Sequence, residues 1–186
     1  VEIKDPKKHR DAGLDASSAV LRVLQQFGYD SADDRIYLQC FDESEVRRLR
    51  QDLKCPLPLI WLTAKAPTAE QLRDARSFCD GLGLLLTLVV PGADSAGRLE
   101  ISPIVSQVHA VGLPVHVWTW RADALPKFVR DGDALLEALT VDAGVDGIFA
   151  DHPDLVLNWR QLRLQQAGRG NPFRLLKIAA PQTPAP

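Results

Sequence analysis

The segment at residues 113–153 constrains the fold most, because it has the pattern of a strand, a helix and a second strand. Residues 115–119 are β-branched and aromatic and follow a proline, which predicts a buried parallel strand. Leucines recur at helical spacing within residues 135–139, and Gly144 is suited to end that helix. Residues 148–150 predict a second buried strand. Two parallel strands joined by a helix form a right-handed crossover unit.

The rest of the chain continues this alternation of strands and helices. Further strands are predicted at residues 1–4, 35–41, 59–63 and 84–90, with helical patterns or loops between them. The run at 84–90 is apolar on both faces, which is typical of a parallel strand covered by helices. Six strands alternating with helices predict an α/β protein with a parallel sheet.

Capping residues and strand parity predict where individual side chains lie. Asp15, Thr68 and either Asp42 or Ser44 precede helical patterns and are predicted N-caps. Along the strand at 35–41 the side chains alternate between two faces, and the more apolar set is expected to pack under helices. The two sets are Ile36, Leu38 and Cys40 on one face, and Tyr37, Gln39 and Phe41 on the other.

Composition narrows the class of protein. The 186 residues suit one domain, and 46% of them are hydrophobic, which is enough for a substantial core. The net charge of −2 gives no indication of nucleic acid or an anionic membrane as a partner. No apolar run approaches the roughly 20 residues of a membrane span, so none is expected. The three cysteines lack metal-ligand spacing and are expected to be buried free thiols.

The sequence also predicts the character of the two ends of the chain. There is no methionine, and residue 1 begins within a predicted strand, so we expect this chain to be the C-terminal part of a longer protein. Residues 1–160 are expected to form the folded domain. Residues 161–186 are expected to be a tail, which is proline-rich and disordered at its end.

Three motifs resemble those of the glycerophosphodiester phosphodiesterase family, in the family's order. Val-Glu-Ile-Lys at 1–4 resembles its Glu-Ile-Lys strand, and Leu-Gln-Cys-Phe-Asp at 38–42 resembles its Gln-Ser-Phe-Asp strand, with Cys40 in place of serine. Val-His-Val-Trp-Thr-Trp-Arg at 115–121 and Gly-Val-Asp-Gly-Ile-Phe-Ala-Asp-His-Pro at 144–153 resemble its last two barrel strands. Arg-Ala-Asp-Ala-Leu-Pro, from Arg121 on, resembles the periplasmic branch.

The resemblance implies that residues 1–160 are the C-terminal part of a TIM-type (β/α)8 barrel, here incomplete with its N-terminal strands missing, since a complete barrel needs about 250 residues. It also implies metal-dependent hydrolysis of glycerophosphodiesters to glycerol 3-phosphate and an alcohol, with a Ca²⁺ or Mg²⁺ cofactor and a periplasmic or secreted location. The family's two catalytic histidines lie upstream of this part, and no His-Arg-Gly motif occurs here. We therefore expect this chain alone to be inactive.

The predicted site residues lie at the carboxyl ends of strands, where barrels of this type place their active sites. The resemblance makes Glu2 the third carboxylate of the metal site; an ion pair between Glu2 and Lys4 is the alternative. Lys4 is expected to bind the substrate phosphate, and Gln39 to bind a phosphate oxygen, orient Lys4 or be structural. Trp118 is expected to form a wall for the glycerol or alcohol group, unless it is a core aromatic. His9 could reach substrate, whereas His116 is expected in the core.

Two other functions stay open. Lys4 could form a Schiff base, although that requires desolvation and the carboxylate of Glu2 favours the charged ammonium. Alternatively, the chain could be a truncated, non-catalytic barrel module that binds a partner. Because the strand at 1–4 would leave an unpaired edge, self-association through that edge is also expected.

Overall fold

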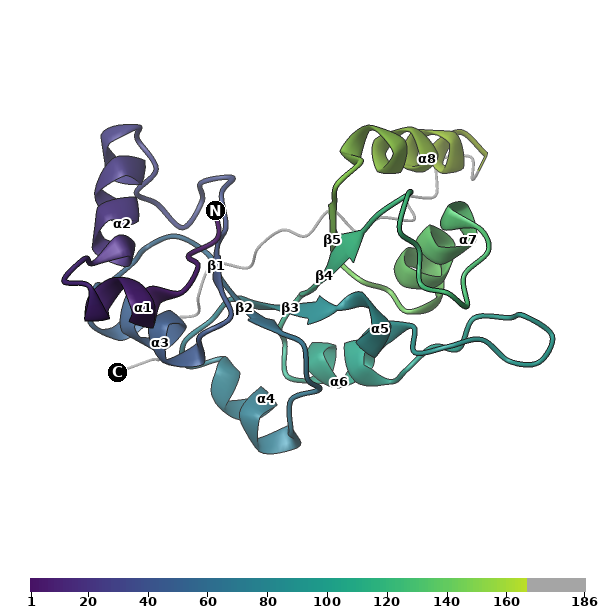
Figure 1. Ribbon diagram of the computed structural model, residues 1–186, viewed down its shortest axis with the longest axis horizontal. Helices are drawn as coiled ribbons and strands as arrows, with labels where there is room; N and C mark the ends of the chain where they lie inside the picture. The colour runs from purple at the N-terminus through teal and green to yellow at the C-terminus, as the bar shows by residue number, and fades with distance from the viewer. Residues whose placement is uncertain (167–186) are drawn as a thin grey trace.

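A single parallel sheet organises the molecule. The computed structural model describes residues 1–166, and within them five parallel strands lie side by side in chain order (Figure 1). The same unit repeats along the chain, as the sequence predicts: a strand is followed by a segment that covers the sheet and then by the neighbouring strand. The strands are β1 (Leu38–Cys40), β2 (Leu59–Thr63), β3 (Gly81–Leu85), β4 (Val115–Trp120) and β5 (Gly147–Ala150).

Helices connect and cover the strands, and three predicted N-caps are confirmed. Asp15, Asp42 and Thr68 each accept a hydrogen bond from a backbone N–H in the first turn of the helix that follows. The helices are α1 (Pro6–Asp11), α2 (Ala16–Gln26), α3 (Glu43–Gln51), α4 (Ala69–Ala75), α5 (Leu86–Val89), α6 (Ile104–Ala110), α7 (Gly132–Glu137) with a π-helical turn at Ala138–Asp142, and α8 (Pro153–Gln166).

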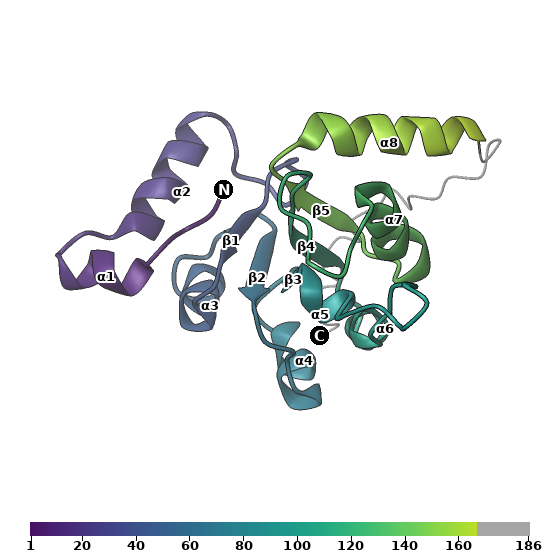
Figure 2. The ribbon, with the colours of Figure 1, turned by 45° about the vertical axis from the view of Figure 1, so that its right-hand side comes forward.

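The sheet is strongly curled. Strands three positions apart in a flat sheet are about 14 Å apart, yet side chains next to β1 contact side chains of β4. The rings of Tyr37 and His116 have centroids 5.0 Å apart, and those of Phe41 and Trp118 are 5.1 Å apart. These side chains therefore lie on the inside of the curve, as in part of a barrel, and Figure 2 shows the strands turning around this concave side.

The outer face of the sheet carries the main core. Leu38, Leu82 and Val115 alternate with the inward side chains and are fully buried beneath the helices. On β2, Trp61 packs against Phe78, which follows α4, with ring centroids 5.7 Å apart. The parity predicted for the strand at 35–41 is confirmed, since its apolar set points to this core.

The strand predicted at residues 84–90 is wrong in its position. β3 occupies Gly81–Leu85, and the chain then turns into the short helix α5. Periodicity cannot distinguish a buried strand from a buried helix in a short apolar run. Gly83 belongs to the strand, and a Cβ at this position would lie 2.3 Å from Leu62 Cδ2.

The first predicted strand is much reduced. Residues 1–4 contribute one isolated parallel bridge, in which Glu2 is the partner of Gln39. At the other end, α8 continues to Gln166, past the boundary expected at residue 160. The part of the predicted tail from residue 167 on lies outside the described residues. Within residues 1–166, no helix is long and apolar enough to cross a membrane.

Candidate active site at the carboxyl ends of the strands

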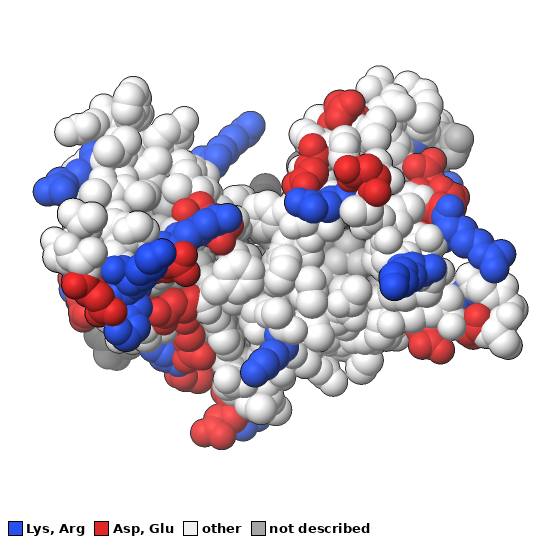
Figure 3. Space-filling model, in the orientation of Figure 1, with Lys and Arg blue, Asp and Glu red and all other residues white. Residues whose placement is uncertain are grey.

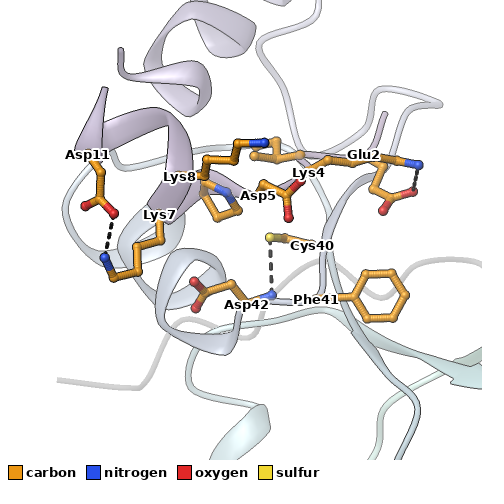
Figure 4. Close-up of a pocket in the computed structure, with 11 residues that line it drawn as sticks. Glu2, Lys4, Asp5, Lys7, Lys8, Asp11, Cys40, Phe41 and Asp42 are labelled. Carbon is orange, nitrogen blue, oxygen red and sulfur yellow. Dashed lines mark hydrogen bonds and ion pairs between the residues drawn. The ribbon is translucent and has the colours of Figure 1, made fainter. Parts of the chain in front are cut away.

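A pocket of about 540 Å³ lies where the N-terminal segment and β1 end, beneath α1 (Figure 4). Its lining mixes cationic and anionic side chains around an apolar floor. The cations are Lys4, Lys7 and Lys8, and the carboxylates are Glu2, Asp5, Asp11 and Asp42. On the surface, positive and negative side chains are interspersed around α1, and acidic side chains with basic ones beside them also border the hollow on the side of α8 (Figure 3).

Backbone hydrogen bonds fix Glu2 beside Gln39. Ile3 N donates to Gln39 O at 2.9 Å, and Gln39 N donates to Val1 O at 2.9 Å. Residues paired across parallel strands project to the same face, so the Glu2 carboxylate and the Gln39 amide are neighbours on the inner face. The Glu2 side chain is 25% exposed and lies 3.8 Å from Lys4 Nζ. The ion pair with Lys4, which is the alternative to a metal ligand at Glu2, is therefore present in this structure.

Gln39 has an unused hydrogen-bond acceptor. Its Oε1 atom is buried and has no hydrogen-bond partner among the described residues. A buried polar atom without a partner costs free energy, so such an atom calls for an explanation, such as a ligand or a missing neighbour. Together, Glu2 and Gln39 offer two side chains with oxygen atoms of the type that hard divalent cations prefer.

These oxygens fit only one side of a divalent-cation site. Among residues 1–166, no group of three or more His, Cys, Asp or Glu side chains is arranged to hold a metal ion. Cys40 lines the same pocket, but burial raises the pKa of its thiol to about 11. Since the thiolate is the nucleophilic form, Cys40 is unsuited to be a nucleophile at neutral pH.

Trp118 forms a fixed aromatic wall on the inner face. Its indole Nε1 donates to Gly83 O at 2.9 Å, which orients the ring and satisfies its only donor. The edge-to-face contact with Phe41 connects this wall to the pocket, because Phe41 also lines the pocket and is 47% exposed. Trp118 is thus neither a pure core residue nor a member of the pocket lining itself.

The lysines of the pocket differ in their partners. Lys7 pairs with Asp11 at 2.7 Å, four residues along α1, whereas Lys4 is 74% exposed and pairs with Glu2. Lys8 has no ion-pair partner among the described residues. The ammonium group of Lys8 is therefore available at the rim of the pocket.

No histidine is among the residues that line the pocket. His9 is on α1 and is not part of the pocket lining. His116 is buried between Tyr37 and Phe149, and burial lowers its pKa, so the imidazole is neutral at pH 7. His109 pairs with Asp146 at 2.8 Å near the amino end of β4, on the opposite side of the barrel from the pocket.

Comparison with known proteins identifies the family. Residues 1–155 match the glycerophosphoryl diester phosphodiesterase family. This chain belongs to that family. A glycerophosphodiester phosphodiesterase of Haemophilus influenzae is 30% identical over an alignment that covers 82% of this chain and 50% of the relative. One of Treponema pallidum is 28% identical over an alignment that covers 83% of this chain and 51% of that relative.

This chain spans about half the length of these curated relatives.

Solved structures support the fold. A glycerophosphodiester phosphodiesterase from Parabacteroides distasonis matches 88% of the chain with a TM-score of 0.57, and the match covers 56% of that protein. An Oleispira antarctica phosphodiesterase, solved with the product sn-glycerol-3-phosphate, matches 79% with a TM-score of 0.53, and the match covers 49% of it. Both are 19% identical to this chain, so they bear on the fold alone. The predicted family and the incomplete α/β barrel are confirmed.

Proposed function

We propose that this chain is the C-terminal half of a glycerophosphodiester phosphodiesterase, which hydrolyses glycerophosphodiesters to glycerol 3-phosphate and an alcohol. The observation that carries the proposal is the placement of Glu2, Gln39 and Trp118 on one concave face, at the ends where barrel enzymes bind substrate. The half-length match to relatives of that activity supports it. The complete protein is this chain joined to the N-terminal strands that would close the barrel.

Glu2 is proposed to be one carboxylate ligand of a Ca²⁺ or Mg²⁺ ion in the complete protein, with Gln39 beside it. When bound, such an ion stabilises negative charge on the phosphoryl group. Glu2 suits this role because it is partly exposed and has only a long contact, 3.8 Å, with Lys4. The other ligands and both catalytic histidines are proposed to come from the N-terminal half.

Lys4 and Trp118 are proposed to bind the substrate. Lys4 is a flexible point charge, suited to a phosphate oxygen, and it can exchange its contact with Glu2 for one with the substrate. The Gln39 side chain can donate to a second phosphate oxygen from its amide nitrogen. Trp118 and Phe41 form an apolar corner against which the carbon skeleton of the glycerol or alcohol group can pack.

The two other functions have less support. A Schiff-base lysine must be desolvated, whereas Lys4 is 74% exposed and is paired with a carboxylate. A binding module remains the second candidate, because apolar side chains are exposed at both edges of the curled sheet. They are Leu14, Val23 and Phe27 near α2, and Leu155, Leu157 and Leu162 on α8. A second copy of this chain or the N-terminal half could cover them.

Release of glycerol 3-phosphate tests the proposal directly. We expect release by the complete protein in the presence of Ca²⁺ or Mg²⁺, its loss on chelation, and none from the 186-residue chain alone. Absence of release by the complete protein would refute the activity, and turnover by the chain alone would refute its dependence on an N-terminal half. The periplasmic or secreted location stays a prediction, which rests on the Arg121–Pro126 motif and is testable by fractionation.

A further inference from the structure

One carboxylate is completely buried at the junction of α1, α2 and α3. The Glu45 side chain of α3 has no exposed area. Its Oε1 atom accepts hydrogen bonds from Ser17 Oγ at 2.5 Å and from Arg48 Nη1 at 2.8 Å. Its Oε2 atom accepts one from Arg10 Nη1. A buried charge is costly unless it is paired and hydrogen-bonded, and here both oxygens are.

The donors to this carboxylate come from three helices. Arg10 is on α1, Ser17 on α2 and Arg48 on α3 itself. Arg48 also pairs with Asp15, the residue that caps α2. One polar junction therefore ties the hairpin of α1 and α2 to the helix that follows β1.

Apolar packing anchors α2 but contributes little to α1. In α2, Val20, Leu21 and Leu24 are half-buried against the core, whereas in α1 only Pro6 is buried. Val23 and Phe27, which project from the same hairpin, are 51% and 75% exposed. Charged hydrogen bonds are directional, so the Glu45 junction determines where α1 lies more than the apolar contacts do.

The position of α1 in turn determines the roof of the pocket. Asp5, whose φ of 46° lies in the left-handed region, connects Lys4 directly to α1. Asp5 O accepts the hydrogen bond from His9 N that starts the helix. Lys8 and Pro6 of the same helix line the pocket opposite Phe41. A shift of α1 therefore displaces Lys4 and Lys8 together.

We infer that Glu45 and Arg10 are positioning residues: through their buried ion pair they hold the Lys4–Lys8 segment over the pocket at the strand ends. Neither side chain lines the pocket, so their effect is transmitted through α1. The effect on substrate rests on the proposed function, whereas the effect on α1 does not.

Hydrogen exchange of the 186-residue chain tests the structural part. In Glu45→Gln and in Arg10→Gln, we expect the amides of His9 in α1 and of Ala12, the C-cap of α1, to exchange at least about tenfold faster, while amides of β4 keep their rates. Glu43→Gln, on the same helix, is the control for Glu45. Arg22→Gln, on the exposed part of α2, is the control for Arg10. Unchanged α1 rates, or an equal rise throughout the chain, would overturn the inference.

Kinetics of the complete protein test the consequence for substrate. Both variants are expected to raise KM for a glycerophosphodiester about fivefold or more, with a smaller change in kcat, since Lys4 would be misplaced for binding. Arg10→Lys should restore most of the loss, because Arg10 makes a single hydrogen bond to Glu45. Faster α1 exchange with an unchanged KM would overturn the positioning role. If the wild-type complete protein is inactive, the proposed function fails, and the exchange experiment still decides whether the junction holds α1.

Discussion

The two faces of the curled sheet are built from the same strands but differ in how completely their side chains are packed. On the outer face, Leu38 and Leu82 are fully buried under helices. On the inner face, Phe41 is 47% exposed, and Gln39 keeps a buried acceptor without a partner among residues 1–166. Because side chains alternate along a strand, one short sequence such as residues 38–41 serves both environments.

Within this chain the outer face is suited to stability and the inner face is suited to binding. The outer face buries its apolar side chains using only elements that the chain contains, so it can hold the half-barrel together. At the carboxyl ends of the strands, the inner face brings together a carboxylate, an amide and an aromatic wall, which bury little apolar area and are suited to bind a ligand. Deeper inside, the same face is closed by the buried side chains of Ile60 and Leu62. Substitutions on the two faces should therefore have effects of different size and kind.

The largest difference in the loss of stability is expected between substituting a leucine of the outer face and substituting an aromatic residue of the inner face. Leu82→Ala should lower the free energy of unfolding by about 2–5 kcal/mol, because it leaves a cavity in the packed outer layer. Phe41→Ala should cost less than about 1 kcal/mol, since its ring is half exposed. Urea denaturation of both variants measures the free energy of unfolding. Equal losses in the two variants would mean that the two faces contribute equally to stability.

A smaller effect is expected at Gly83, where the inner face is closely packed. A Cβ at this position would lie 2.3 Å from Leu62 Cδ2, and Leu62 is buried. Gly83→Ala should therefore destabilise the chain by about 1–3 kcal/mol. In a Leu62→Ala background the same change should cost at least about 1 kcal/mol less, because the clash is gone. Additive losses in this double-mutant cycle would show that the inner face has room at β3.

The smallest expected effect is a pH dependence of stability, which arises from His116 on the inner face. Burial lowers the pKa of His116 in the folded chain, so below about pH 6.5 the unfolded chain binds more protons at this residue. His116 should thus contribute stability that is present above that pH and is lost as the pH falls through the folded pKa. We expect wild type to lose stability relative to His116→Phe between about pH 7.5 and pH 5. A constant difference across that range would contradict it.

Local patterns in the sequence were sufficient for the fold class, the helix caps and the alternation of side chains along β1. The caps at Asp15, Asp42 and Thr68, and the alternation along β1, depend on neighbouring residues and were predicted. The position of β3 was not, because Gly81 and Gly83 are in the strand where bulky neighbours on adjacent strands leave no space for a Cβ. That constraint depends on pairing with β2 and β4 and cannot be read from the residues themselves.

The candidate site was predicted only in part for the same reason. Parity placed Glu2 beside Lys4, and the pairing with Gln39 is consistent with their shared face. The contact of Trp118 with Phe41 depends on the curl of the sheet. Glu45 was missed altogether, because an acidic residue in the first turn of a helix normally interacts with solvent and the helix dipole. Its burial depends on Arg10, which is 35 residues away in the chain.

The most direct test of the account is the kinetic effect of removing the Glu2 charge in the complete protein. For Glu2→Gln we predict that kcat/KM for release of glycerol 3-phosphate falls at least about 100-fold, or about 2.7 kcal/mol, because a charged oxygen ligand is lost from the concave face. Glu43→Gln, on the outer helix α3, should stay within about twofold of wild type. Wild-type kcat/KM in Glu2→Gln, with both variants equally stable, would contradict the placement of the active site on the inner face.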